Sequence, residues 1–217
     1  MLGHPVLYYP ANAATKSKLI QKFFCSSDDE KILNEAEKLN YIPIKRPPEL
    51  AQPDSQHIDC ILHALEVIGK NFEIPEILVV ILANNVTVKS QYINDCVNIL
   101  LDDPEISAAV PVYVDNDHHP LRAKTVDENN KLQMYEKNIT GKISTNRQDL
   151  PKCYFLSHNF WVLRTSNFTE ENILNGQQPW SFMGNNIAYY EIGESIDIHK
   201  ETDLILAREW IKKNYTD

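Results

Sequence analysis

The chain has 217 residues, of which 43% are hydrophobic and 24% are charged, and its formal net charge is -9. This length suits one domain with a sizeable buried core, and the composition is that of a globular protein. The acidic balance argues against a nucleic-acid partner, and no apolar run or leader suggests a membrane or secretory route, so we expect a cytoplasmic protein.

Short apolar runs alternate along the chain with segments whose apolar residues recur at helical spacing. The short, branched runs indicate strands, and the helical spacing indicates helices that pack on a sheet. We expect strands at residues 22–25, 41–44, 77–83, 107–114, 155–163 and 187–192. We expect helices after residue 6, from 28 to 39, from 55 to 69, around 93 to 100 and from 203 to 213. This order predicts a three-layer α/β fold around a mostly parallel sheet.

Residues 115–151 interrupt this alternation with polar segments such as Asp-Asn-Asp-His-His-Pro. The short apolar pieces between these segments predict a hairpin that projects from the sheet. We therefore expect a single domain over residues 1–217, in which residues 115–151 form a dimerisation arm.

Polar residues follow four of the apolar runs, where the predicted strands end. They are Ser26 to Asp29, Arg46, Asn84 with Asn85, and Asp197 with His199. In an open α/β sheet, ligands bind outside the carboxyl ends of the strands, which makes all four candidates for a binding site. Each has a structural alternative: residues 26–29 are also typical of a helix cap, and Arg46 of a solvated surface.

Asp197 and His199 flank Ile198 in an extended segment, so their side chains are expected on one face. A carboxylate suits Mg²⁺, whereas an imidazole is a poorer partner for that ion. A helix cap or a plain surface pair is the structural alternative for these two residues. The neighbouring pair His118 and His119 is interpreted as a solvated loop, because adjacent residues rarely chelate one ion.

Several of these segments together resemble the acylneuraminate cytidylyltransferase family, whose members activate sialic acids and related sugar acids as CMP conjugates. Residues 26–32, Ser-Ser-Asp-Asp-Glu-Lys-Ile, are similar to the family pattern S-T-D-D-E-x-I. Residues 46–51, Arg-Pro-Pro-Glu-Leu-Ala, with Ile58-Asp59 and residues 62–65, resemble R-P-x-E-L-A … I-D … L-H-A-L. Residues 147–151 and 196–198 also fit. The resemblance implies a Rossmann-like nucleotide-diphospho-sugar transferase fold.

The resemblance also implies roles for individual residues. Arg46 matches an arginine on the cytosine ring, and Asp197 matches a carboxylate that holds Mg²⁺ against the triphosphate of CTP. The other expected nucleotide-binding residues are Ser27, Asp28 and His57; the sugar-binding residues are Asn84, Asn85, Lys89 and Arg147; and His199 is the second metal candidate. A hydroxyl of the sugar acid attacks the α-phosphorus in such enzymes, and pyrophosphate leaves. We expect a homodimer and assign no catalytic residue.

Four departures from the family pattern accompany these matches. The similarity starts at Gly3, just after the strand and phosphate-binding loop with which family members begin. Residues 83–89 replace the pattern Q-P-T-S-P-L-R, His57 replaces a serine near the base, and His199 replaces the second carboxylate of D-x-D. Three interpretations stay open: a start codon placed too late, an inactive relative that binds or supports, and a relative that uses another nucleotide or sugar. In each, Arg46 and Asp197 are expected to converge at one rim of the sheet.

Overall fold

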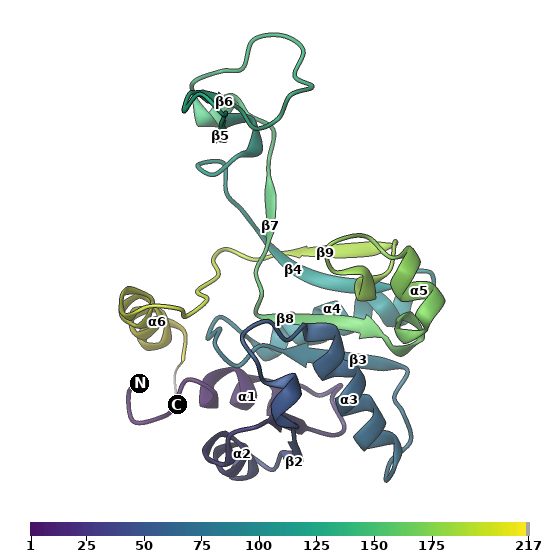
Figure 1. Ribbon diagram of the computed structural model, residues 1–217. Coiled ribbons are helices and arrows are strands. Elements are labelled where there is room, and N and C mark those ends of the chain that lie inside the picture. The colour runs from purple at the N-terminus through teal and green to yellow at the C-terminus, as the bar shows by residue number, and fades with distance from the viewer. Residues whose placement is uncertain (216–217) are drawn as a thin grey trace.

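A computed structural model of the protein describes residues 1–215 (Figure 1). A five-stranded sheet forms its centre, in the order β3-β8-β4-β7, and β9 pairs with the free edge of β4. Its strands are β3 (Ile77–Ile81), β4 (Ala108–Val114), β7 (Tyr154–Leu156), β8 (Phe160–Arg164) and β9 (Ile187–Glu191).

The strands of this sheet run in both directions. β8 is antiparallel to β3 and to β4, β7 is antiparallel to β4, and β9 is parallel to β4. The prediction of a mostly parallel sheet is thereby corrected to a mixed sheet, in which β3, β4 and β9 run the same way. An apolar run indicates burial and not direction, which is why the pattern could not distinguish the two.

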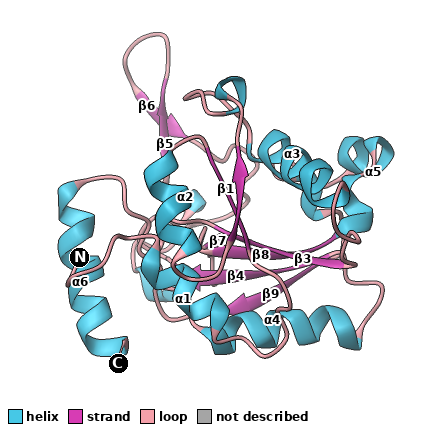
Figure 2. Cartoon of the chain, turned by 90° about the horizontal axis from the view of Figure 1, so that it is seen from below, coloured by secondary structure: helices cyan, strands magenta, loops and turns pink. Residues whose placement is uncertain are grey.

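Helices cover both faces of the sheet, so the predicted three-layer α/β architecture is confirmed. Ala13 of α1 (Tyr8–Thr15) and Ile93 of α4 (Ser90–Asp102) pack against the strands on one face. Ile61 of α3 (His57–Gly69) packs on the other face with Phe182. Figure 2 shows α4 on one side of the strands, and α3 and α5 (Glu170–Asn175) on the other.

Two further units flank the central sheet. β1 (Phe24–Ser27) and β2 (Ile42–Lys45) form a separate parallel pair that packs with α2 (Glu30–Glu37). The last helix, α6 (Glu201–Asn214), buries Trp210 against Tyr9 of α1, so the first and the last helix lie close together (Figure 1). β3 is therefore an edge strand of the large sheet and is only partly buried, although its apolar run predicted full burial.

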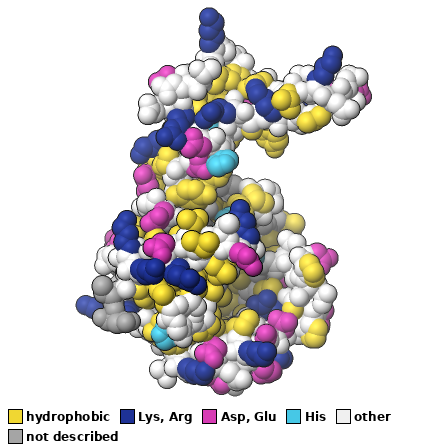
Figure 3. All heavy atoms as spheres, turned by 90° about the vertical axis from the view of Figure 1, so that its left-hand side faces the viewer, with side chains coloured by type: hydrophobic (Ala, Val, Ile, Leu, Met, Phe, Trp, Pro, Cys, Tyr) yellow, Lys and Arg dark blue, Asp and Glu magenta, His cyan; other side chains and the backbone are white. Residues whose placement is uncertain are grey.

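The predicted projecting hairpin is present. β4 and β7 lead out of the sheet into an arm whose tip carries β5 (Lys124–Val126) paired antiparallel with β6 (Leu132–Met134). Asp127 accepts hydrogen bonds from the N–H groups of Asn129 and Lys131 at 2.9 and 2.8 Å, and it thereby closes the turn between these strands. The space-filling view shows the arm standing away from the body (Figure 3). Among residues 1–215, no helix has the length and apolar content needed to cross a bilayer.

Candidate functional site

The carboxyl ends of β3, β4 and β9 lie at one edge of the sheet, because these three strands run the same way. Asn84 follows β3 and Asp197 follows β9, and a hydrogen bond of 2.6 Å joins the Asn84 amide to the Asp197 carboxylate. The backbone N–H of Ile198 donates to the Asn84 carbonyl at 3.0 Å. Segments more than a hundred residues apart in the chain therefore meet at this rim, as predicted from the polar residues that follow the apolar runs.

Asn85, beside this contact, is completely buried and fully hydrogen-bonded. Its amide nitrogen donates to the Ser157 carbonyl at 2.9 Å and to the Ser195 hydroxyl at 3.0 Å. Its amide oxygen accepts from the backbone N–H and the hydroxyl of Thr87. No hydrogen-bonding capacity is left for a ligand. The predicted sugar-binding role of Asn85 is therefore corrected to a structural one.

Asn85 holds a bulge between β7 and β8 in place. Both strands pair with β4, and residues 157–159 break the run that was predicted as one strand. Asn159 is buried too, and its amide donates to the Thr87 carbonyl at 3.1 Å. Between these anchors, His158 has a φ of 50°, a left-handed conformation that a non-glycine residue seldom adopts. Bulges of this kind re-aim side chains at functional sites.

His158 belongs to a group of residues at the sheet rim that we call the rim cluster. Its ring centroid lies 5.0 Å from that of Trp180 and 6.3 Å from that of Trp161. The ring of His57, the first residue of α3, lies 5.4 Å from Trp161 at an interplanar angle of 86°. The full rim cluster is Arg46, His57, His158, Trp161, Trp180 and Asp197.

The two charged members act on the two histidines between them. Burial lowers the pKa of His57, and the positive charge of Arg46 lowers it further. Burial also lowers the pKa of His158; the negative charge of Asp197 opposes this shift, and His57 adds to it. Both imidazoles are therefore neutral near pH 7. A guanidinium and a carboxylate thus flank a pair of neutral rings at one rim.

Arg46 is held in position by the end of β1. Its Nη2 group donates to the Ser26 carbonyl at 2.7 Å, and its Nε donates to the Ser26 hydroxyl at 3.2 Å. Ser27 is buried and accepts from the Asp29 N–H at 3.2 Å, so its hydroxyl serves the start of α2. The Asp28 side chain is exposed, and its carbonyl accepts from Lys45 at 2.6 Å. The predicted nucleotide-binding residues thus surround the end of the β1–β2 pair.

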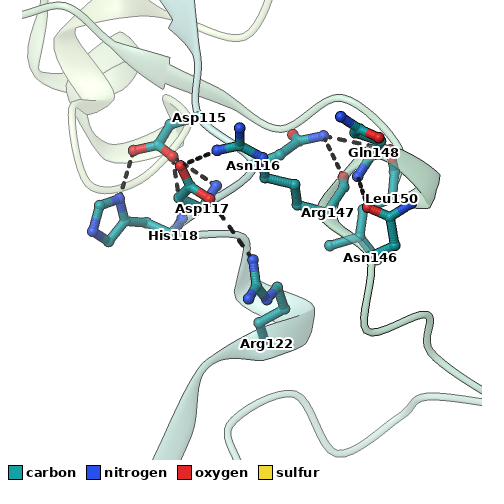
Figure 4. A network of polar contacts seen from close by, with 9 residues as sticks. All are labelled: Asp115, Asn116, Asp117, His118, Arg122, Asn146, Arg147, Gln148 and Leu150. Carbon is teal, nitrogen blue, oxygen red and sulfur yellow. Dashed lines mark hydrogen bonds and ion pairs between the residues drawn. The ribbon is translucent and has the colours of Figure 1, made fainter.

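Two predicted sugar-binding residues lie away from the rim cluster within residues 1–215. Lys89 donates to Asn214 of α6 at 2.9 Å and lies 5.5 Å from the ring of Trp210. Arg147 lies at the base of the arm, where its Nη1 is 2.6 Å from a carboxylate oxygen of Asp117 (Figure 4). The partner of Lys89 comes from the last helix, and the partner of Arg147 comes from the other side of the arm base.

The site offers one carboxylate for a metal ion. Among residues 1–215, no three side chains of the His, Cys, Asp or Glu type gather in a metal-binding group. His199 is 2.9 Å from the second carboxylate oxygen of Asp197 and is largely exposed. Mg²⁺ commonly uses one or two carboxylates, several waters and the phosphates of its substrate. The residues present therefore fit an ion that is carried by a polyphosphate.

Three members of the rim cluster were not predicted. Trp161 is completely buried and its Nε1 has no hydrogen-bond partner within residues 1–215. His158 and Trp180 are partly exposed. Nothing in the sequence marks a histidine inside an apolar run as a bulge residue, and Trp180 comes from a loop that only the fold brings to this rim.

No protein-family model matches the chain. Many solved structures match the fold, among them the following two. CMP:2-keto-3-deoxy-manno-octonic acid synthetase complexed with CTP has a TM-score of 0.69 at 12% identity, over 99% of this chain and 90% of that chain. 4-Diphosphocytidyl-2C-methyl-D-erythritol synthase from Anaerococcus prevotii has a TM-score of 0.62 at 13% identity, over 97% and 87%. The chain therefore has a nucleotide-diphospho-sugar transferase fold, while its acylneuraminate assignment stays a prediction.

Proposed function

We propose that this protein is a CTP-dependent nucleotidyltransferase, which transfers CMP from CTP to a sugar acid and releases pyrophosphate. One observation carries the proposal: the rings of His57 and His158 both lie against Trp161 at the carboxyl edge of the sheet. Asn84 holds Asp197 at the same edge, and the charge of Arg46 acts on His57. The fold adds support, because both similar structures are named for cytidylyl chemistry. A sialic-acid-like acceptor follows from the sequence resemblance.

Arg46 would bind the cytosine ring. The hydrogen bonds to Ser26 use its Nε and Nη2, so its Nη1 group is left to donate to a base edge. His57 stands beside it as a neutral ring. Asp28, exposed at the end of β1, would accept a hydrogen bond from a ribose hydroxyl.

Asp197 would hold Mg²⁺ against the phosphates of CTP, as the magnesium-dependent family implies. Asn84 donates to one of its oxygens and His199 pairs with the other, so the carboxylate is held in a defined orientation. The ion, when bound, neutralises negative charge on the phosphates. His199 would therefore orient the Asp197 carboxylate and would not bind the ion itself.

The chemistry is an exchange at the α-phosphorus of CTP. The oxygen of the acceptor hydroxyl forms a bond to that phosphorus and releases its proton to water. The bond to the bridging oxygen breaks, and pyrophosphate leaves with the electron pair. Catalysis of this kind depends on positioning and charge neutralisation. Arg46 and Asp197 would therefore fix the nucleotide from its two ends.

The arm would pair two copies of the chain. Val126, Leu132 and Tyr135 are 61%, 71% and 67% exposed, and partner contact would bury these apolar side chains. In such a homodimer, Arg147 of one copy would approach the sugar acid bound by the other. Asn84, beside Asp197, is the proposed sugar contact within one chain.

The decisive test combines nucleotide binding with turnover. Isothermal titration with CTP, UTP and GTP should show tightest binding of CTP, and pyrophosphate should appear with Mg²⁺ and a sugar acid from a panel of sialic-acid and 2-keto-3-deoxy types. R46A should weaken CTP binding at least about ten-fold, because it removes hydrogen bonds and charge together. D197N should abolish turnover with little loss of folding.

The matched control is R122A, an arginine of the arm with a 3.9 Å contact to Asp117. It should leave CTP binding unchanged. Tight binding of CTP without pyrophosphate release would favour an inactive relative, and no binding of CTP would contradict the proposal.

A further inference from the structure

Two aromatic side chains stand together at the rim and do not bury each other. His158 and Trp180 are partly exposed, and their ring centroids are 5.0 Å apart at an interplanar angle of 57°. Within residues 1–215, neither nitrogen of the His158 ring has a hydrogen-bond partner. Trp180 packs one side against the core and leaves part of its indole at the surface, beside an imidazole with free hydrogen-bonding capacity.

The backbone fixes His158 in this position. The left-handed conformation at φ 50° costs free energy, and it persists because the flanking residues are buried and hydrogen-bonded. Ser157 donates its N–H to the Pro111 carbonyl at 3.0 Å, and Leu82 donates to the Asn159 carbonyl at 3.0 Å. The bulge therefore aims one side chain out of a rigid strand.

The loop of Trp180 is fixed as well. The Asn167 amide, which is buried, donates to the Phe182 carbonyl at 3.1 Å, and the Ser107 hydroxyl donates to the Met183 carbonyl at 2.7 Å. A side chain at Gly176 would collide with the Ser181 carbonyl, so this loop folds closely on itself. Both rings are thus held in place before any ligand arrives, which lowers the entropic cost of binding.

The chemistry of this pair suits an oxygenated ring. The face of an indole packs against the apolar face of a sugar, while an imidazole donates or accepts one hydrogen bond from a hydroxyl or carboxylate. The ring of Trp161 lies 6.3 Å from that of His158 and extends this aromatic surface inward. Arg46 and Asp197 already account for the base and the phosphates in the proposed function, so the pair is available for the second substrate.

We propose that His158 and Trp180 form the subsite that binds the ring of the sugar-acid acceptor. This rests on the proposed function, and it assigns specificity to two residues outside the motifs of the sequence resemblance. The subsite is built by the bulge and the Trp180 loop, which only the fold brings together.

The test uses variants that keep the backbone. H158G removes the imidazole at a position whose left-handed backbone conformation glycine adopts readily, and W180L removes the aromatic face. Each should raise the KM for the acceptor about ten-fold, the value of one hydrogen bond or one aromatic contact. CTP affinity, measured by titration calorimetry, should change less than about two-fold. H118G, at an exposed histidine of the arm loop, should leave both values unchanged.

Tryptophan fluorescence gives a readout that needs no turnover. The protein has 3 tryptophans, and the sugar acid should quench emission in the wild type and in W210F but not in W180F. An acceptor KM that stays the same in folded H158G and W180L would overturn the subsite while CTP binding still supports the proposed function. If CTP alone quenches the emission of the wild type and not that of W180F, the subsite is also overturned, because the ring bound there would be that of the nucleotide. Failure of wild-type protein to bind CTP would instead contradict the proposed function.

Discussion

Two polar networks of this protein differ in how strongly they hold the backbone around them. The network of Asn85, Ser157 and Asn159 is buried beneath the rim, and it holds His158 in a left-handed conformation. The network at the base of the arm joins Asp117 to Arg147 and Arg122 at the surface, where the side chains are 40% to 57% exposed (Figure 4). Buried hydrogen bonds are costly to break, whereas exposed ion pairs contribute little. The first network therefore stabilises the backbone of a site, whereas the second contributes little to the stability of the arm base.

The largest expected effect is on the buried network. N85A should lower the free energy of unfolding by about 3 kcal/mol, because it leaves the backbone N–H and the hydroxyl of Thr87 buried without the acceptor that they share. Urea denaturation followed by circular dichroism measures this. N116A, at the arm base, is the matched control and should lose far less. Equal losses in the two variants would remove the distinction between the networks.

A smaller effect is expected from the pH dependence of the rim. Burial lowers the pKa of His57 and of His158 in the folded state, so the unfolded chain binds more protons at acid pH. Stability should therefore fall as the pH drops below about 6.5, the ordinary pKa of histidine. H158G should flatten this fall when melting temperatures are compared from pH 7.5 to pH 5.5. An identical slope in H158G and wild type would show that the pKa of His158 is not lowered in the folded state.

The smallest effect is expected at the arm base. R147A removes an exposed ion pair and should change the free energy of unfolding by less than about 0.5 kcal/mol. If the arm serves a dimer, the same variant should instead reduce turnover. A large loss of stability in R147A, measured on the same urea curves, would place the arm base among the buried elements of the fold.

The meeting of polar segments at the sheet rim was predictable where polar residues follow strands. Asn84 and Asp197 were predicted in this way and contact each other, because strand ends are visible in the sequence and the carboxyl edge of a sheet is a general binding position. Lys89 was placed with the sugar by its neighbours in the chain, but α6 supplies its actual partners. Contacts between residues more than a hundred positions apart leave no local pattern from which they can be predicted.

The sequence by itself determined the α/β class, the approximate places of the strands and helices, and the projecting arm, because hydrophobic periodicity is a local consequence of burying one face of an element. The direction of β8, the separation of the β1–β2 pair from the large sheet and the bulge at His158 were decided by the tertiary structure alone. Each of these depends on which backbone groups find partners across the sheet, and apolar spacing carries no information about that pairing.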